Sequence, residues 1–161
     1  MRRLILLRHA KAIPYVSGDD WLRPLLPSGM DDALAAGREL ANYSIDLAYV
    51  STAKRTEQTW HIACRGGAAA ARVENVDWLY GASTSKLVRE VTSLPDDLAT
   101  VLFVGHEPGM SSVALELAAP TEPFAELVPH LPTASMIVLT YEGDWAEMLG
   151  VCKLEHVYVR Q

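Results

Sequence analysis

The pattern of apolar and polar positions predicts strands and helices that alternate along most of the chain. Residues Leu4 to Leu7 form an uninterrupted apolar run, which is typical of a short strand buried on both faces. The runs 45–50 and 101–104 have the same character, and a segment with helical spacing follows each of them. This order predicts an α/β fold in which strand–helix–strand units cross over with the right-handed sense.

Helical spacing of apolar residues is found in three segments, 28–41, 53–64 and 83–91. The first and the third begin on a serine, a residue whose hydroxyl commonly caps a helix N-terminus. A further helix is expected to begin at Ser111 or Ser112, after the turn that follows the run 101–104. The sequence therefore predicts several helices to cover the strands.

The remaining strands are expected at 72–76, as a short edge strand, and at 136–141 and 151–159. The last two are joined by a turn-rich segment that is too short for a helical crossover, so they are predicted to be antiparallel. The segments 11–27 and 120–132 are rich in proline and are expected to be irregular. Together these elements predict a three-layer α/β/α sandwich around a mostly parallel sheet.

Composition limits the class of protein. The chain has 161 residues, of which 50% are apolar and 21% are charged, so residues 1–161 are expected to form a single globular domain. The formal net charge of −6 lacks the basic footprint of a nucleic-acid-binding protein. No apolar run approaches the length of a membrane span, no signal peptide is recognisable, and Cys64 and Cys152 form no CxxC pair. A cytoplasmic protein without a membrane or nucleic-acid partner is therefore expected.

Polar side chains follow three of the predicted strands. Arg8 and His9 end the first, Arg55 comes soon after the second, and His106 follows the third. Open α/β sheets bind ligands at the carboxyl ends of their strands. A guanidinium group offers donors that match phosphate oxygens, and an imidazole can attack phosphorus. Because two guanidinium and two imidazole groups in one crevice favour an anion, the sequence predicts a site for a phosphoryl group.

Three separated motifs indicate a family. They read Leu-Leu-Arg-His-Ala-Lys-Ala at 6–12, Ser-Thr-Ala-Lys-Arg-Thr-Glu-Gln-Thr at 51–59 and Val-Gly-His-Glu-Pro-Gly at 104–109. In this order they resemble the histidine phosphatase superfamily, which has a phosphoglycerate mutase-like fold, and within it the short SixA-type branch of phosphohistidine phosphatases. The resemblance extends over nearly the whole chain and includes Arg23-Pro24-Leu25 and Pro132-Thr133-Ala134-Ser135.

The resemblance implies a role for each residue of the predicted site. His9 would be the nucleophile that forms a covalent phosphohistidine intermediate, and Arg8, Arg55 and His106 would bind the phosphoryl oxygens. A hydrogen bond to one ring nitrogen of His9 should fix its tautomer and leave the other nitrogen free to attack. The family needs no metal and no cofactor. The expected substrate is a phosphorylated protein, a phosphohistidine carrier domain, or a small phosphoester, and the chain is expected to act as a monomer.

The chain departs from the wider superfamily at two positions. Ala10 stands where the common motif has glycine. Larger relatives also place a carboxylic acid after the middle strand, where only Asp77 could serve here, and a turn or capping role is the alternative for it. A phosphorylated imidazole leaves as a far less basic nitrogen than an alkoxide oxygen. A site without a general acid is therefore expected to favour cleavage of P–N over P–O bonds.

Three rival functions stay open from the sequence. One is a phosphatase for small esters with Asp77 as the acid, and another is a phosphate-binding module without turnover. The third is a metal hydrolase that uses His9, His106 and Asp77, although no HxH or HExxH spacing supports it. The sequence assigns no role to four further polar residues, Lys11, Asp19, Glu107 and His130.

Overall fold

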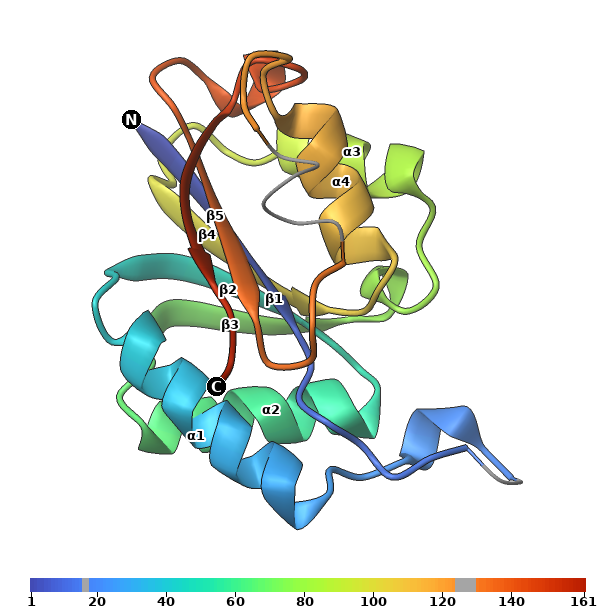
Figure 1. Ribbon diagram of the computed structural model, residues 1–161. Helices are drawn as coiled ribbons and strands as arrows, with labels where there is room; N and C mark the ends of the chain where they lie inside the picture. Colours follow the sequence, from blue (N-terminus) through green and yellow to red (C-terminus); the bar gives the residue numbers. More distant parts are fainter. Residues whose placement is uncertain (16–17, 124–129) are drawn as a thin grey trace.

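A six-stranded sheet with helices on both of its faces makes up the computed structural model of the protein, which describes residues 1–15, 18–123 and 130–161 (Figure 1). The strands are β1 (Arg2–Arg8), β2 (Ile45–Ser51), β3 (Ala70–Val76), β4 (Thr100–Gly105), β5 (Met136–Tyr141) and β6 (Lys153–Tyr158). The helices are α1 (Pro27–Leu40), α2 (Lys54–Arg65), α3 (Thr84–Thr92) and α4 (Gly109–Leu117). Three short 3₁₀ turns are η1 (Asp20–Leu22), η2 (Asp77–Leu79) and η3 (Trp145–Glu147).

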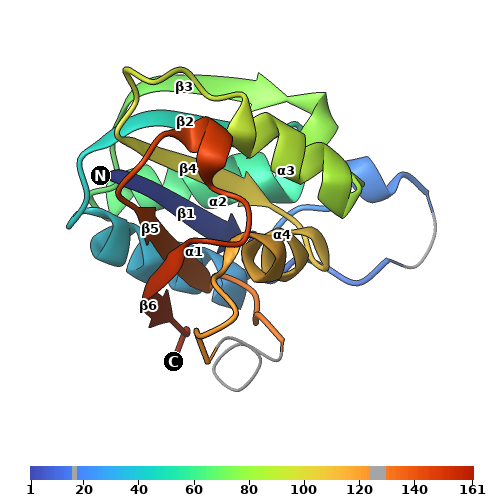
Figure 2. The same ribbon diagram turned by 90° about the horizontal axis from the view of Figure 1, so that it is seen from above.

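The strand order in the sheet is β3-β2-β4-β1-β5-β6. The strands β3, β2, β4 and β1 are parallel to one another, whereas β5 runs antiparallel to both β1 and β6. Helices α1 and α2 cover one face and α3 and α4 the other, as both views show (Figures 1 and 2). The predicted three-layer α/β/α sandwich with a mostly parallel sheet is confirmed, including the edge position of β3.

The first strand lies in the middle of the sheet and is buried on both faces, as predicted. Leu4 and Leu6 pack into the core beneath α3 and α4, and Ile5 and Leu7 pack into the core beneath α1 and α2. All four side chains are fully buried. Because β1, β4 and β2 are adjacent and parallel, their carboxyl ends meet at one edge of the sheet.

The predicted start of the first helix is wrong by one residue. Helix α1 begins at Pro27, with Leu26 in the N-cap position and without a side-chain cap, so Ser28 lies inside the first turn. Proline is favoured at the first helical position because its missing N–H would have no partner there. The expected cap of the third helix is confirmed, since the Ser83 hydroxyl accepts a hydrogen bond from the N–H of Lys86 at 3.2 Å.

The predicted start of the fourth helix is also wrong. Helix α4 begins at Gly109, two residues before Ser111. The carboxylate of Glu107 accepts hydrogen bonds from both the N–H (2.8 Å) and the hydroxyl (2.6 Å) of Ser111. The glutamate therefore satisfies one free backbone donor of this first turn, the N–H of Ser111, a role that was expected of a serine.

None of the helices in the described ranges is long and apolar enough to span a membrane.

Helices α1 and α2 lie in close contact at Gly37, where a Cβ atom would clash with the carbonyl oxygen of Ala63. Alanine normally stabilises a helix relative to glycine, by about 1 kcal/mol. Here we expect Gly37→Ala to lower the free energy of unfolding by about 1–3 kcal/mol, because the helices are forced apart. Denaturant unfolding measures this change, with the exposed neighbour Arg38→Ala as the control. A Gly37→Ala chain as stable as the wild type would contradict this view of the helix pair.

Candidate active site

The polar residues predicted at the strand ends come together at one edge of the sheet. Arg8 is the last residue of β1 and His9 follows it, Arg55 lies in the first turn of α2, and His106 follows β4. The ring centroids of His9 and His106 are 5.3 Å apart. The structure thus brings residues from three separate segments into one cluster.

Backbone hydrogen bonds hold the loop around His9 on three sides. The N–H of His9 donates to the carbonyl of Gly105 at 3.0 Å, and the His9 carbonyl accepts from the N–H of Ala134 at 3.0 Å. The next N–H, that of Ala10, donates to the hydroxyl of Thr59 at 2.9 Å. His9 is therefore tied to the end of β4, to the segment before β5 and to α2, which limits the freedom of its ring.

The His9 ring has one defined tautomer. Its Nδ1 lies 2.7 Å from the backbone carbonyl oxygen of Ala10. A carbonyl can only accept, so Nδ1 carries the proton and Nε2 keeps its lone pair. The ring is only 8% exposed. Burial lowers the pKa of His9 to about 4, and the charges of Arg55 and Arg8 also lower it. At neutral pH His9 is therefore an uncharged imidazole with a free Nε2, and the hydrogen bond that was expected to fix its tautomer is present.

His106 is held through its other ring nitrogen. Its Nε2 lies 2.8 Å from the hydroxyl oxygen of Ser51, the last residue of β2. That oxygen also accepts a hydrogen bond from the N–H of Ala53 at 3.4 Å, so the Ser51 proton can be donated to Nε2. When the Ser51 hydroxyl donates in this way, the ring proton of His106 lies on Nδ1. Burial lowers the pKa of His106 to about 3, with the neighbouring His9 and Arg55 adding to the effect.

Three buried nitrogen atoms of the cluster have no hydrogen-bond partner among the residues that the structure describes. They are Nε of Arg8, Nε of Arg55 and Nδ1 of His106. The two guanidinium groups are otherwise anchored: Nη1 of Arg8 donates to the carbonyl of Leu131 at 3.0 Å, and Nη1 of Arg55 to that of Asp20 at 2.9 Å. A buried donor without a partner costs about 1–3 kcal/mol. An anion with several oxygens would satisfy such donors together.

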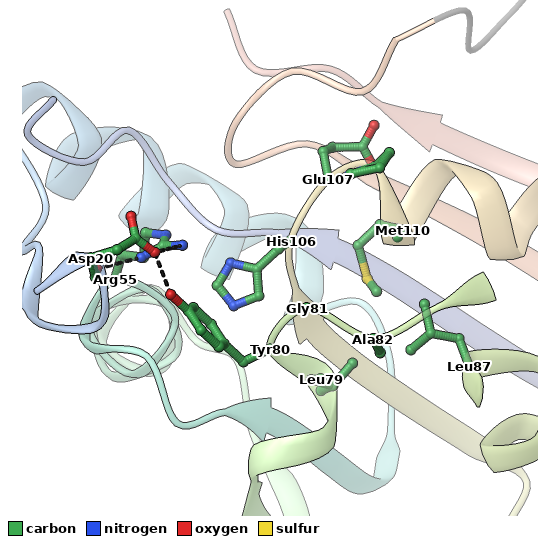
Figure 3. A pocket seen from close by; sticks show the side chains of 12 residues that line it. Asp20, Arg55, Leu79, Tyr80, Gly81, Ala82, Leu87, His106, Glu107 and Met110 are labelled. Carbon is green, nitrogen blue, oxygen red and sulfur yellow. Dashed lines mark hydrogen bonds and ion pairs between the residues drawn. The ribbon is translucent and has the colours of Figure 1, made fainter. Parts of the chain in front are cut away.

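A cavity of about 330 Å³ opens beside this cluster (Figure 3). Arg55, His106 and Tyr80 form part of its wall, and Leu87 and Met110 belong to an apolar part. The cavity thus has a charged and polar region next to an apolar region. Such a shape suits a phosphoryl group that is bonded to a flat or apolar leaving group.

Comparisons with known proteins identify the family. The model of the histidine phosphatase superfamily (branch 1) matches residues 4–79. One similar structure is a SixA protein from Nakamurella multipartitia, which is named as a candidate phosphohistidine phosphatase. It is 34% identical to this chain with a TM-score of 0.85, and the match covers 99% of this chain and 96% of the SixA chain. The chain belongs to the histidine phosphatase superfamily, in its SixA-type branch.

Two further relatives of this SixA-type protein cover nearly all of it. An uncharacterized protein from Mycobacterium tuberculosis is 37% identical over 153 residues, which are 91% of this chain and 94% of the relative. A SixA protein from Agrobacterium tumefaciens is 25% identical with a TM-score of 0.82, and the match covers 98% of both chains.

Asp77, the only carboxyl group that the sequence offered as a general acid, does not line the cavity of this SixA-type protein. It is exposed at the start of η2, and its Oδ1 accepts a hydrogen bond from the hydroxyl of Thr52 at 2.9 Å. This contact joins Asp77 to the segment after β2, 25 positions away, and η2 has no side-chain cap, so the contact is neither the general-acid position nor the local cap that the sequence suggested. In residues 1–15, 18–123 and 130–161, no group of three or more His, Cys, Asp or Glu side chains could hold a metal ion.

The structure also shows the positions of the four residues to which the sequence assigned no role. Glu107 lines the cavity, but its carboxylate is engaged with Ser111 at the start of α4. Asp19 is exposed and caps η1 by accepting a hydrogen bond from the N–H of Trp21 at 3.0 Å. Lys11 and His130 are exposed, and neither lines the cavity.

Three functional residues were not singled out by the sequence analysis. Ser51 positions His106, and Asp20 and Tyr80 form the wall of the cavity next to Arg55. The position of Ser51 at a strand end was a usable signal, like that of His106. Asp20 lies in the proline-rich segment 11–27, which was expected to be irregular, and nothing in the sequence pattern linked it to Tyr80.

Proposed function

We propose that this SixA-type protein is a phosphatase that passes a phosphoryl group first to His9 and then to water, and that its substrate is phosphohistidine on a protein. The observation that carries the proposal is the state of His9. Its ring is buried and neutral, with Nε2 free, in a cluster that contains three buried nitrogen atoms without a partner in the described part of the chain. A nucleophile and a set of oxyanion donors are the two parts that phosphoryl transfer requires.

In the first step Nε2 of His9 attacks phosphorus and the bond from phosphorus to the leaving nitrogen breaks. The electron pair of that bond goes to the leaving nitrogen. Negative charge on the phosphoryl oxygens is stabilised by the guanidinium groups of Arg8 and Arg55 and by the Nδ1–H of His106. Because two fixed positive charges are supplied by the chain itself, we propose that the reaction proceeds without a metal.

In the second step water attacks the phosphoryl group on His9, and its proton passes to a phosphate oxygen. The bond from phosphorus to Nε2 breaks, and the electron pair returns to the ring. The carbonyl of Ala10 keeps the proton on Nδ1 throughout, so His9 leaves as a neutral imidazole ready for the next cycle.

The carboxyl groups on the cavity support cleavage of P–N rather than P–O bonds. They are Asp20 and Glu107. The hydroxyl of Tyr80 and the side chain of Arg23 hold the pKa of Asp20 at about 2, so it is ionised, and Glu107 is engaged with Ser111. An alkoxide leaving group needs a proton from a nearby acid, whereas a ring nitrogen does not. The SixA protein from Nakamurella multipartitia is likewise named as a candidate phosphohistidine phosphatase.

The test compares the hydrolysis of a phosphohistidine carrier domain with that of alkyl and aryl phosphates, with and without a chelator. We expect kcat/KM to be at least about 100-fold higher for the carrier, with no effect of the chelator. Equal turnover of both classes would indicate a phosphatase for small esters. Binding of the carrier without phosphate release would indicate a phosphate-binding module, and loss of activity with the chelator a metal enzyme.

Because the pKa values of the two histidines are lowered, we expect kcat/KM to fall only at an unusually low pH. Because His9 must be neutral to attack, kcat/KM should stay constant as the pH falls through 6.5 and should decrease only near the His9 pKa of about 4. The unfolded chain binds these protons at about pH 6.5, so the stability of the fold should decrease between that pH and 4. A pH profile, corrected for substrate ionisation and checked by circular dichroism, measures the limit. A decrease of kcat/KM near pH 6.5, the ordinary histidine pKa, would contradict a His9 that is buried and neutral.

A further inference from the structure

The turn η1 places the carboxylate of Asp20 directly on the phosphate-binding arginine (Figure 3). Oδ2 of Asp20 accepts a hydrogen bond from Nη2 of Arg55 at 3.1 Å and one from the hydroxyl of Tyr80 at 2.5 Å. Oδ1 accepts from Nε of Arg23 at 2.8 Å. The charged and titratable groups that face this carboxylate are Arg55, Tyr80 and Arg23, together with His106 on the same cavity.

Asp20 is nevertheless reachable from the cavity. Its side chain is 36% exposed and lines the same cavity as His106 and Arg55. The Tyr80 hydroxyl and the two arginines keep it ionised, and Asp20 in turn raises the pKa of Tyr80. At neutral pH Asp20 therefore carries no proton, and the Tyr80 hydroxyl is a weaker acid than an ordinary tyrosine. An ionised carboxylate at this place can only accept a hydrogen bond or attract a positive charge.

We infer that Asp20 determines leaving-group specificity, because its carboxylate accepts a hydrogen bond from the far ring nitrogen of a phosphohistidine and so keeps that nitrogen protonated. The inference rests on the proposed function. It assigns to a residue outside the predicted site the choice between nitrogen-linked and oxygen-linked phosphoryl groups.

The contact between Asp20 and the far ring nitrogen matters because it improves the leaving group in P–N cleavage. When the far nitrogen carries a proton, the ring takes the electron pair of the broken P–N bond and leaves as neutral imidazole. No proton has to be delivered during the step, because the one needed is already on the ring. Without that proton the ring would leave as an anion, which is a much poorer leaving group. A carboxylate beside the far nitrogen favours the protonated form electrostatically.

The same carboxylate works against phosphoesters. The negative charge of the carboxylate repels the anionic phosphoryl group of either substrate. A phosphohistidine offsets this repulsion through its N–H, whereas an alkyl or aryl oxygen has no N–H to offer Asp20. Asp20 also occupies one of the Nη donors of Arg55, and a phosphate oxygen would compete for that donor. One side chain thus favours nitrogen-linked substrates and disfavours oxygen-linked ones.

The cavity wall is suited to a flat ring. The Tyr80 ring, which lines the cavity, stands edge-on to His106 with centroids 5.4 Å apart. Trp21 does not line the cavity but packs edge-on against Tyr80 at 5.1 Å. Edge-on aromatic pairs present faces against which an imidazole can pack. This wall and the carboxylate together fit a protonated imidazole better than an aliphatic alcohol.

The test is Asp20→Asn with Asp19→Asn as the matched control. Asp19 is the exposed neighbour in the same turn, its loss changes the net charge equally, and asparagine can still cap η1. For Asp20→Asn we expect kcat/KM on the phosphohistidine carrier to fall by about 10-fold to 100-fold. We expect hydrolysis of p-nitrophenyl phosphate to rise and inhibition by tungstate to tighten, each by several-fold. Asp19→Asn should alter none of the three.

The pH dependence separates this specificity from a structural role. In acid, solvent protonates the far ring nitrogen and the loss in Asp20→Asn should be small, whereas it should grow as the pH rises above about 6.5. Asp20→Glu retains a carboxylate and should recover much of the preference for the carrier. Thermal unfolding confirms that each variant is folded.

The outcomes are distinguishable. A fall in Asp20→Asn that is equal for the carrier and for p-nitrophenyl phosphate would overturn the inference while the proposed function stands. A loss that does not depend on pH would overturn it as well. If the wild-type chain does not hydrolyse the carrier, the proposed function fails and the inference fails with it.

Discussion

Replacing His9 with alanine is expected to lower kcat/KM for any phosphoryl substrate by at least about 1,000-fold. The reason is that Nε2 of His9 forms the bond to phosphorus in the first step. The arginines and His106 stay in place in this variant, so substrate binding should survive while the chemical step is lost. Steady-state kinetics on the phosphohistidine carrier should therefore show a fall in kcat rather than a rise in KM.

The control for this variant is His61→Ala. His61 is an exposed histidine on α2, outside the cavity, so its loss removes the same type of side chain without touching the cluster. We expect His61→Ala to behave as the wild type. If His9→Ala kept activity within about 10-fold of the wild type, water would be attacking the substrate directly, and the covalent route would be wrong.

Replacing Arg55 with alanine is expected to lower kcat/KM by about 100-fold to 1,000-fold. Two effects add in this variant. The phosphoryl oxygens lose a guanidinium group in the transition state, and Asp20 loses the two donors that hold it across the cavity. Because Asp20 then keeps its charge beside the phosphoryl site without a partner from Arg55, binding of anions should weaken too. Kinetics together with tungstate inhibition measure both effects.

The matched control is Arg65→Ala, at the exposed C-terminal end of the same helix. It removes an equal charge from α2 at a distance from the cavity and should leave kcat/KM and tungstate inhibition unchanged. An Arg55→Ala chain that binds tungstate as tightly as the wild type would show that this guanidinium does not contact the oxyanion.

The four residues of the cluster could be predicted from the sequence because of where they stand along the chain. Arg8, His9 and His106 directly follow apolar runs, and Arg55 comes shortly after another. Since β1, β2 and β4 are adjacent and parallel, polar residues just after them must meet at one edge of the sheet. Local order along the chain was enough to place them.

The charge state of the cluster could not be predicted in the same way. The sequence suggested two guanidinium and two imidazole groups that repel one another. In the structure, burial lowers the pKa of His9 to about 4 and that of His106 to about 3, so only the arginines are charged at neutral pH. Burial depends on the packing of the whole fold, which no short motif reports.

Long-range contacts explain the other omissions. Asp20 meets Arg55 across 35 positions and Tyr80 across 60, and Ser51 meets His106 across 55. Asp20 lies in an irregular segment without periodicity, so the pattern of the sequence did not predict which part of the fold its side chain would face. The helix starts at Pro27 and Gly109 were missed because the decisive groups there are a proline ring and a glutamate side chain rather than the expected serines.

The central claim is that the phosphoryl group is carried on His9. The most direct test is a rapid-quench experiment over the first turnover with a carrier domain that bears radiolabelled phosphohistidine. The account predicts label on the wild-type chain that is stable in alkali and labile in acid, mapped to His9, absent from His9→Ala and present in His61→Ala. Release of labelled phosphate at the wild-type rate with no label on the protein at any time point would contradict it.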